Sequence, residues 1–136
     1  MTHDIQRINP PQLFDSTPNG HSQGSVVESG SKLAFFSGQI AWSPQRTEAP
    51  HSLLEQTRMV TANLQVCLDS VGATRDDIAM ARIYVVDLTP ERLEEAFPAL
   101  LEFFGDAYPS MTGIGVQALA GPELQIEIEM VVRVPS

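Results

Sequence analysis

Apolar and polar positions alternate with a helical period in the middle of the chain. From Leu53 to Val71 the apolar side chains recur every three or four residues, which predicts an amphipathic helix. Ser52, with Glu55 three residues later, has the pattern of a capping box at its start. Gly72 is suited to end it. We therefore expect a helix between Ser52 and Gly72.

A second helix is predicted further along the chain. Thr89 followed by Pro90 fits an N-cap and a first helical position, and Gly105 marks the other end. Pro98 lies inside this segment, where proline removes a backbone hydrogen bond at a cost of roughly 3 kcal/mol if nothing relieves it. We therefore expect this helix to be bent or interrupted near Pro98.

The other apolar segments have the pattern of strands. Residues 25–28 and 33–40, joined by a turn at 29–31, predict a β-hairpin. Residues 78–87 are rich in β-branched side chains and predict a third strand. Residues 108–132 predict a short strand, a Gly-Pro turn and a strand of alternating Ile and Glu. In that last strand we expect the Ile side chains to face the core and the Glu side chains to face away.

These elements predict one α+β domain with the order ββαβαββ. A chain of 136 residues is long enough for one domain and too short for two ordinary ones. Residues 1–24 contain three prolines and few periodic apolar residues, and are expected to form an irregular N-terminal arm. The domain itself is expected over residues 25–136.

The charge and composition exclude several classes of partner. Seventeen acidic against eight basic side chains give a net charge of -9, which repels a phosphate backbone and argues against nucleic acid. No apolar run approaches the ~20 residues of a membrane span, and residues 1–4 lack the layout of a signal peptide. We therefore expect a cytoplasmic protein without a membrane partner.

The sequence also predicts neither a metal nor an organic cofactor. Cys67 is the only cysteine, so it has no intrachain partner and no cysteine-rich metal site is available. His3, His21 and His51 are too scattered to indicate metal-ligand spacing. No phosphate-binding glycine loop or dinucleotide fingerprint is present in the sequence.

Several short segments stand in a distinctive order and spacing over roughly residues 20–132. They are Phe36–Ile40, Gln56-Thr57, Asn63-Leu64, Gly72, Tyr84–Leu88, Phe103–Gly105, Pro109 and Ile126–Glu129. Together they resemble the Rid family, also called YjgF, of reactive intermediate deaminases. The resemblance implies a chorismate-mutase-like α+β fold and a homotrimer around a barrel of sheets, with ligand clefts between the subunits. Deaminating members hydrolyse imines or enamines such as 2-aminoacrylate without a cofactor.

The resemblance also implies an unusual anion site. In deaminating members an arginine after the second helix, in a Pro-Ala-Arg-Thr-like motif, pairs with the substrate carboxylate. Here the matching residues read Pro109-Ser110-Met111-Thr112, so Met111 stands at the position of that arginine. Methionine offers an adaptable apolar surface instead of a charged bidentate donor.

Other cleft positions carry over from the family unevenly. Ser37 and Glu127 match its cleft serine and glutamate, and His21 stands where deaminating members have a tyrosine. Gly113 matches the position whose backbone N–H contacts a ligand carbonyl. A carboxylate at Glu127 could orient a water for attack on a C=N bond.

The residues alone leave plainer readings open. Glu127 fits a solvated strand face, Ser37 fits a strand end that bonds its own backbone, and His21 fits an ordinary surface residue. Three functions are therefore carried forward. In the first, the chain binds a small neutral or weakly polar carbonyl or imine, with or without hydrolysing it. In the second, it deaminates 2-aminoacrylate-like substrates, with Arg82 or backbone donors holding the carboxylate. In the third, it is a non-catalytic trimeric binding protein.

Overall fold

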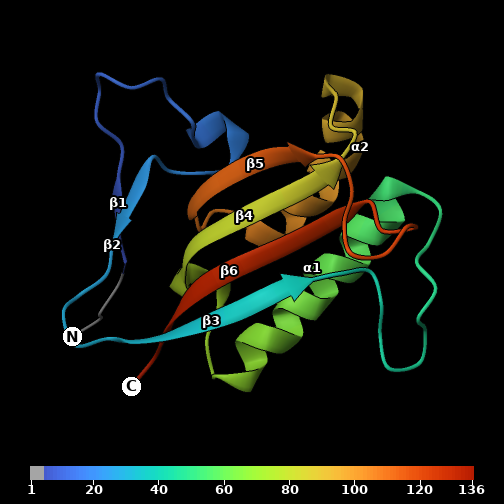
Figure 1. The fold of residues 1–136 in the computed structure, drawn as a ribbon. Helices are drawn as coiled ribbons and strands as arrows, with labels where there is room; N and C mark the ends of the chain where they lie inside the picture. Colours follow the sequence, from blue (N-terminus) through green and yellow to red (C-terminus); the bar gives the residue numbers. More distant parts are fainter. Residues whose placement is uncertain (1–4) are drawn as a thin grey trace.

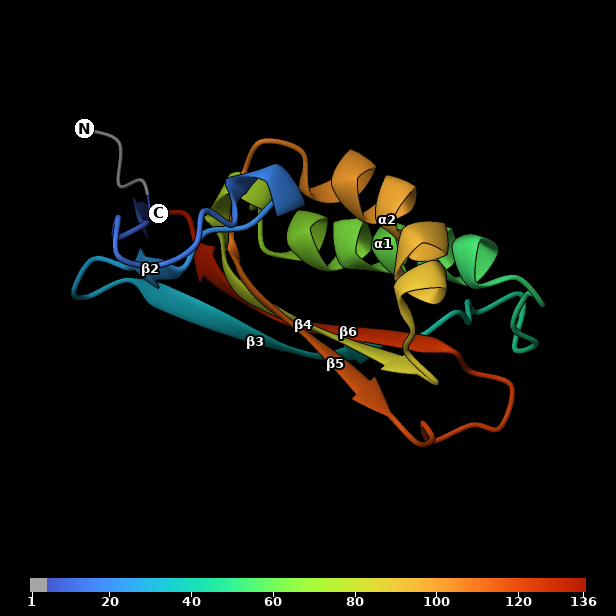
Figure 2. The same cartoon turned by 90° about the horizontal axis from the view of Figure 1, so that it is seen from above.

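The protein has two layers, a four-stranded sheet and two helices packed on one of its faces (Figures 1 and 2). The computed structural model describes residues 5–136. The sheet has the order β3-β6-β4-β5, in which only β4 and β5 are parallel. Its strands are β3 (Lys32–Gln39), β4 (Ile78–Val86), β5 (Ser110–Val116) and β6 (Ile126–Val134), and the helices are α1 (Leu53–Ser70) and α2 (Pro90–Phe104). The predicted α+β class is confirmed.

Helix α1 begins and ends where the sequence predicts. The Ser52 side chain accepts a hydrogen bond from the Glu55 N–H at 3.0 Å, which satisfies one of the free donors of the first turn. Gly72 has a φ of +66°, a left-handed conformation that favours glycine and stops the helix. The face of α1 that carries Val60, Leu64 and Leu68 is buried against the sheet.

Helix α2 starts at its predicted cap, where Thr89 accepts a hydrogen bond from the Arg92 N–H at 3.2 Å. Of the two outcomes expected at Pro98, a bend or an interruption, the interruption does not occur, because α2 is one helix from Pro90 to Phe104. Pro98 has no N–H to donate to the carbonyl of Glu94, one turn earlier in the helix. Both residues lie on the exposed side of α2. Water can reach that carbonyl, so the proline is tolerated.

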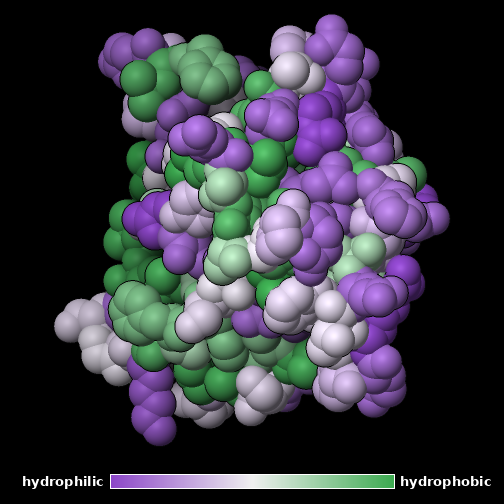
Figure 3. Space-filling view, turned by 45° about the vertical axis from the view of Figure 1, so that its right-hand side comes forward, coloured by the Kyte–Doolittle hydropathy of each residue, from purple (hydrophilic) through white to green (hydrophobic). Residues whose placement is uncertain are grey.

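The sheet buries one face and leaves the other uncovered by helices. In β6, Ile126, Ile128 and Met130 are buried against the helices, as predicted, and Glu127 and Glu129 lie on the opposite face. On the same uncovered face, the Phe35 side chain of the edge strand β3 is 75% exposed. Figure 3, in which this face is turned to the left, shows hydrophobic residues there among hydrophilic ones.

The predicted hairpin of residues 25–28 and 33–40 is wrong. Strand β2 (Gly24–Val26) pairs with β1 (Gln6–Ile8) in a separate two-stranded sheet, whereas β3 pairs with β6. The turn between β2 and β3 is present, but it connects two sheets. Strand β2 has its partner in a segment that the sequence pattern gave no reason to treat as a strand.

The N-terminal arm is therefore more regular than predicted. Besides β1 it contains a short 3-10 helix, η1 (Thr17–Asn19), and Ser16, Gly20 and Ser22 are buried. Residues 1–4 of the predicted arm, His3 among them, lie outside the described residues.

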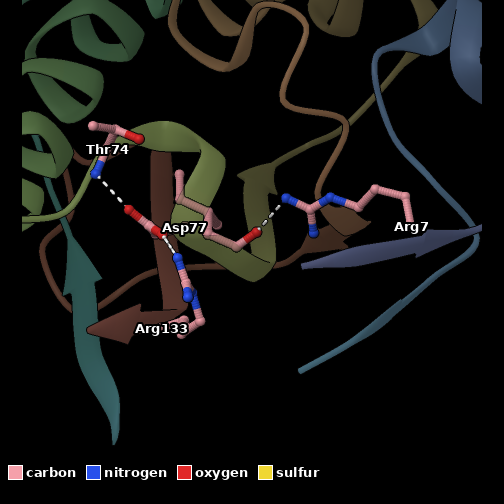
Figure 4. Close-up of polar contacts among 5 residues, drawn as sticks. Arg7, Thr74, Asp77 and Arg133 are labelled. Atoms are coloured by element: carbon pink, nitrogen blue, oxygen red, sulfur yellow. Dashed lines mark hydrogen bonds and ion pairs between the residues drawn. The ribbon is translucent and has the colours of Figure 1, made fainter. Parts of the chain in front are cut away.

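Two arginines tie the ends of the chain to the start of β4 (Figure 4). Arg7 donates to the carbonyls of Ile78, at 2.8 Å, and Ala107, at 3.1 Å, and burial lowers the pKa of its guanidinium. Arg133 on β6 pairs with Asp77, in the 3-10 helix η2 (Arg75–Asp77), at 2.6 Å. These contacts hold the arm and the C-terminal strand against the same short segment. Among residues 5–136, no helix is long and apolar enough to cross a membrane.

Candidate functional site

Three of the predicted site residues come together at one edge of the sheet. His21, Met111 and Gly113 line a common cavity of about 280 Å³, between the arm, β5 and α2. Met111 and Gly113 pair with Ala81 and Ile83 of β4, which places both on the helix-facing side of the sheet. The cavity is otherwise lined by Asn19, Gly20, Ile83, Leu93, Phe97, Leu100, Leu101 and Phe104.

The arm holds His21 at this cavity through short local contacts. The buried Ser16 hydroxyl donates to the His21 carbonyl at 2.7 Å, and the Ser22 N–H donates to the Pro109 carbonyl at 3.1 Å. Gly20 has a φ of +87°, and a Cβ there would stand 3.0 Å from Leu101 Cδ2. A glycine is thus needed for the turn and for the close approach of the arm to α2.

The other two predicted residues lie toward the opposite edge of the sheet, Ser37 on the edge strand β3 and Glu127 on the adjacent strand β6. The pairing of β3 with β6 shifts between Phe36 and Gln39, so that Ser37 and Gly38 form a bulge. A Cβ on Gly38 would overlap the Glu127 carboxylate, so the glycine makes room for that side chain against the bulge. Ser37 also lines a shallow pocket of about 210 Å³ with Arg82 and Glu129.

Charged groups surround Glu127 on the uncovered sheet face. Burial raises the pKa of the Glu127 carboxyl, and the nearby charge of Glu129 raises it further. Glu129 accepts a hydrogen bond from the Tyr84 hydroxyl at 2.6 Å and pairs with Arg82 at 3.3 Å. The hydrogen bond to Glu129 also raises the pKa of Tyr84. Because Arg82 is already paired, the cluster of Arg82, Glu127 and Glu129 keeps one negative charge when both carboxylates are ionised.

The predicted site residues therefore form two half-sites within one chain. The first half-site consists of His21, Met111 and Gly113 beside β5, and the second of Ser37 and Glu127 beside the β3 bulge. Strands β3 and β5 are the two edges of the sheet, with β6 and β4 between them. A single chain does not bring the two half-sites together.

Sequence reasoning missed most of the apolar lining of the first half-site. Leu93, Phe97 and Leu101 belong to α2, and nothing in the sequence shows that this face of α2 meets β5 and the arm. The signal that could have helped is Pro18-Asn19-Gly20, a typical turn sequence just before His21. Within residues 5–136 no group of three or more His, Cys, Asp or Glu side chains could hold a metal ion.

A four-stranded sheet of this order with both helices on one face defines a YjgF-like α+β protein. The family model described as Endoribonuclease L-PSP matches residues 16–134. The chain therefore belongs to this family, which is the Rid/YjgF family that the sequence resembles.

Relatives of known sequence or structure agree with this assignment. YjgH of Escherichia coli, a RutC family protein, is 32% identical over 117 residues, 85% of each chain. TdcF of Escherichia coli, named as a candidate reactive intermediate deaminase, is 26% identical over 132 residues, 96% of each chain. The crystal structure of YyfB from Yersinia pestis, described as a Rid family protein, is 36% identical with a TM-score of 0.88, covering 96% of this chain and 98% of that one.

Proposed function

We propose that this protein is a homotrimer that binds and hydrolyses a small neutral imine or enamine in clefts between its subunits. The observation that carries the proposal is the separation of the two half-sites on opposite edges of one sheet. A cleft that contains both requires the β3 edge of one copy and the β5 edge of another. The exposed Phe35 and Leu33 on β3, 75% and 44% exposed, also favour burial against a second copy.

The chemistry follows from the groups that each half-site offers. The Gly113 N–H would donate to a polar atom of the ligand, and Glu127 would accept a proton from a water as the water oxygen attacks the C=N carbon. The protonated Glu127 then returns its proton to nitrogen, which gives a carbinolamine. Glu127 next takes the carbinolamine hydroxyl proton and passes it to the amine nitrogen, the C–N bond breaks, and ammonia leaves behind a carbonyl. A carboxyl whose pKa is raised by burial suits this proton transfer better than an ordinary one.

A neutral ligand is favoured over a carboxylate because of what surrounds the cleft. At the Met111 half-site the lining is mostly apolar, and among residues 5–136 His21 is the only titratable residue that lines it. At the other half-site Arg82 is paired with Glu129, and Glu127 adds a further negative charge. Losing a charged pair with a substrate carboxylate typically costs about 2 to 5 kcal/mol of binding. Carboxylate substrates such as 2-aminoacrylate are therefore our second candidate.

RNA cleavage, which the family description names, is not the function we propose. The net charge of -9 opposes the approach of a phosphate backbone, and phosphate contacts supply much of RNA affinity.

The decisive experiment restores the charge that Met111 lacks. We expect Met111→Arg to raise the affinity for 2-oxobutyrate about ten- to a hundred-fold, as a charge-assisted bidentate contact worth roughly 1.5 to 3 kcal/mol allows. Thr112→Arg is the matched control, because it adds the same charge one residue along β5, on the opposite face of the sheet. Calorimetric titration of the three proteins measures the effect.

Two further measurements complete the test. The unmodified protein should hydrolyse 2-aminoacrylate slowly or not at all, and light scattering at micromolar concentration should show a trimer. Robust 2-aminoacrylate hydrolysis would support the alternative in which Arg82 holds the carboxylate, since Arg82 shares its pocket with Ser37. A monomer in solution would refute the shared cleft.

A further inference from the structure

The cavity at the Met111 half-site has an apolar wall that the proposed hydrolysis does not use. Helix α2 contributes Leu93, Phe97, Leu100 and Leu101 to it, and Gly113 of β5 lines the same cavity. We propose that this wall holds a hydrocarbon group of the ligand, so that the protein selects neutral carbonyl or imine compounds with a branched aliphatic or aromatic side chain. This inference rests on the proposed function and names its substrate class.

The first argument is the composition of the cavity. Its lining is mostly aliphatic and aromatic, with polar groups from Asn19 and His21 on the arm. Sites of this kind bury the apolar body of a ligand and use a few polar groups to orient it. A volume of about 280 Å³ suits a group of a few carbon atoms better than a large cofactor.

The second argument is the exposure of the α2 side chains. Leu93 and Leu101 are 44% and 38% exposed, although both line the same concave surface. Covering apolar surface is favourable by roughly 25 cal/mol per Å². A hydrocarbon group seated in the cavity gains this free energy, whereas a charged group placed there would lose its hydration without a partner.

The third argument is the empty space above Gly113. A Cβ built on Gly113 would meet no atom within 4 Å, whereas one on Gly115, two residues along β5, would lie 3.0 Å from Leu88. Gly113 is therefore not needed for packing or for a left-handed turn. Its missing side chain keeps the cavity open between β5 and α2.

The test compares a neutral ketone with its smaller and its charged analogue. The probes are 4-methyl-2-pentanone, acetone and 4-methyl-2-oxopentanoate, titrated into protein labelled with carbon-13 at the methionine methyl groups. The Met111 methyl signal, assigned with Met111→Leu, reports occupation of the cavity directly. Three more buried carbons are worth about 50-fold in affinity when fully covered. We expect 4-methyl-2-pentanone to bind at least about ten-fold more tightly than acetone and than the charged analogue.

Gly113→Val tests whether the cavity is the cause. Valine suits a strand and fills the open space, so we expect the preference for 4-methyl-2-pentanone over acetone to fall to less than about two-fold. Thr112→Val places the same side chain on the opposite face and should leave the preference unchanged. If Gly113→Val does not fold, Leu101→Gln tests the same wall from α2 and should also remove the preference.

The outcomes separate this inference from the proposed function. Equal binding of 4-methyl-2-pentanone and acetone, or an unchanged preference in Gly113→Val, overturns the inference even when the protein hydrolyses imines. A preference that depends on Gly113, without any imine hydrolysis, supports the inference and refutes the catalytic part of the proposed function.

Discussion

Replacing Asp77 by asparagine should destabilise the protein strongly, although the two side chains have the same shape. The Asp77 carboxylate is 2.6 Å from the Arg133 guanidinium through one oxygen and accepts the Thr74 N–H at 2.9 Å through the other (Figure 4). The Asp77 side chain is only 9% exposed and the Arg133 side chain only 14%. An asparagine side chain has one oxygen and one NH2 group in place of two oxygens. It can accept a hydrogen bond from only one of the two donors, and its NH2 group faces the other. Arg133 is also left charged without a carboxylate partner.

The expected cost follows from this burial. Removing one member of a buried ion pair costs about 3–5 kcal/mol. Arg133 retains a little solvent contact and the asparagine oxygen keeps one hydrogen bond, so we expect about 2–4 kcal/mol. Within residues 5–136 the buried Arg133 Nε–H has no hydrogen-bond partner, so few groups there could replace Asp77 as a partner of the guanidinium. For a domain of this size the melting temperature should fall by about 6–15 °C.

Urea unfolding followed by circular dichroism measures this cost at one fixed protein concentration, because assembly would otherwise shift the midpoint. Arg133→Met and the double variant complete a mutant cycle, in which we expect a coupling of about 2 kcal/mol. Asp106→Asn is the control, because the Asp106 pair with Arg75 is 3.4 Å long and exposed, and its loss should cost less than about 0.5 kcal/mol. A cost for Asp77→Asn as small as this, or an absence of coupling, would refute the reasoning.

Three further predictions concern the half-sites. Burial raises the folded-state pKa of Glu127, so the native state holds more protons than the unfolded state just above pH ~4.3, and stability falls as pH rises through this window. Glu127→Gln should therefore melt higher than the unmodified protein at pH 7, with the difference vanishing below about pH 4 in a series of thermal melts. Gly38→Ala should displace the Glu127 side chain, lowering imine hydrolysis to the level of Glu127→Gln while urea unfolding changes by less than about 1 kcal/mol. Gly20→Ala should lower the free energy of unfolding in urea by about 1–3 kcal/mol, which is more than Gly30→Ala should. Both glycines have φ near +85°, but only a Cβ at Gly20 would meet Leu101. Equal losses in the two variants would show that the Leu101 contact is unimportant.

The features that the sequence predicted well depend on neighbours in the chain. Ser52, Gly72 and Thr89 act through hydrogen bonds and dihedral angles within a few residues, so their patterns locate the helix ends. The alternation of Ile and Glu in β6 likewise shows which side chains face the core, because strand geometry alone sets it.

What failed depends on contacts between distant segments. The pairing of β2 with β1 joins residues about twenty positions apart, and no local signal separates it from a hairpin with β3. Pro98 was expected to bend or interrupt α2, and no interruption occurs; its effect depends on whether the carbonyl that loses its partner faces water, which only the packing of α2 decides. The cavity was only partly predictable for the same reason: Met111 came from a resemblance, and its α2 wall came from tertiary structure.

The placement of the two half-sites on opposite edges of one sheet has a genetic consequence. In the proposed trimer each cleft draws its β3 edge from one copy and its β5 edge from the next, so a chain defective at one edge still lends its intact edge to a neighbour. A chain inactivated at Glu127 and a chain inactivated at Gly113, produced together in one cell, would assemble into hybrids that contain a working cleft. Two alleles that each abolish activity alone would then complement one another, whereas two alleles damaged at the same edge would not.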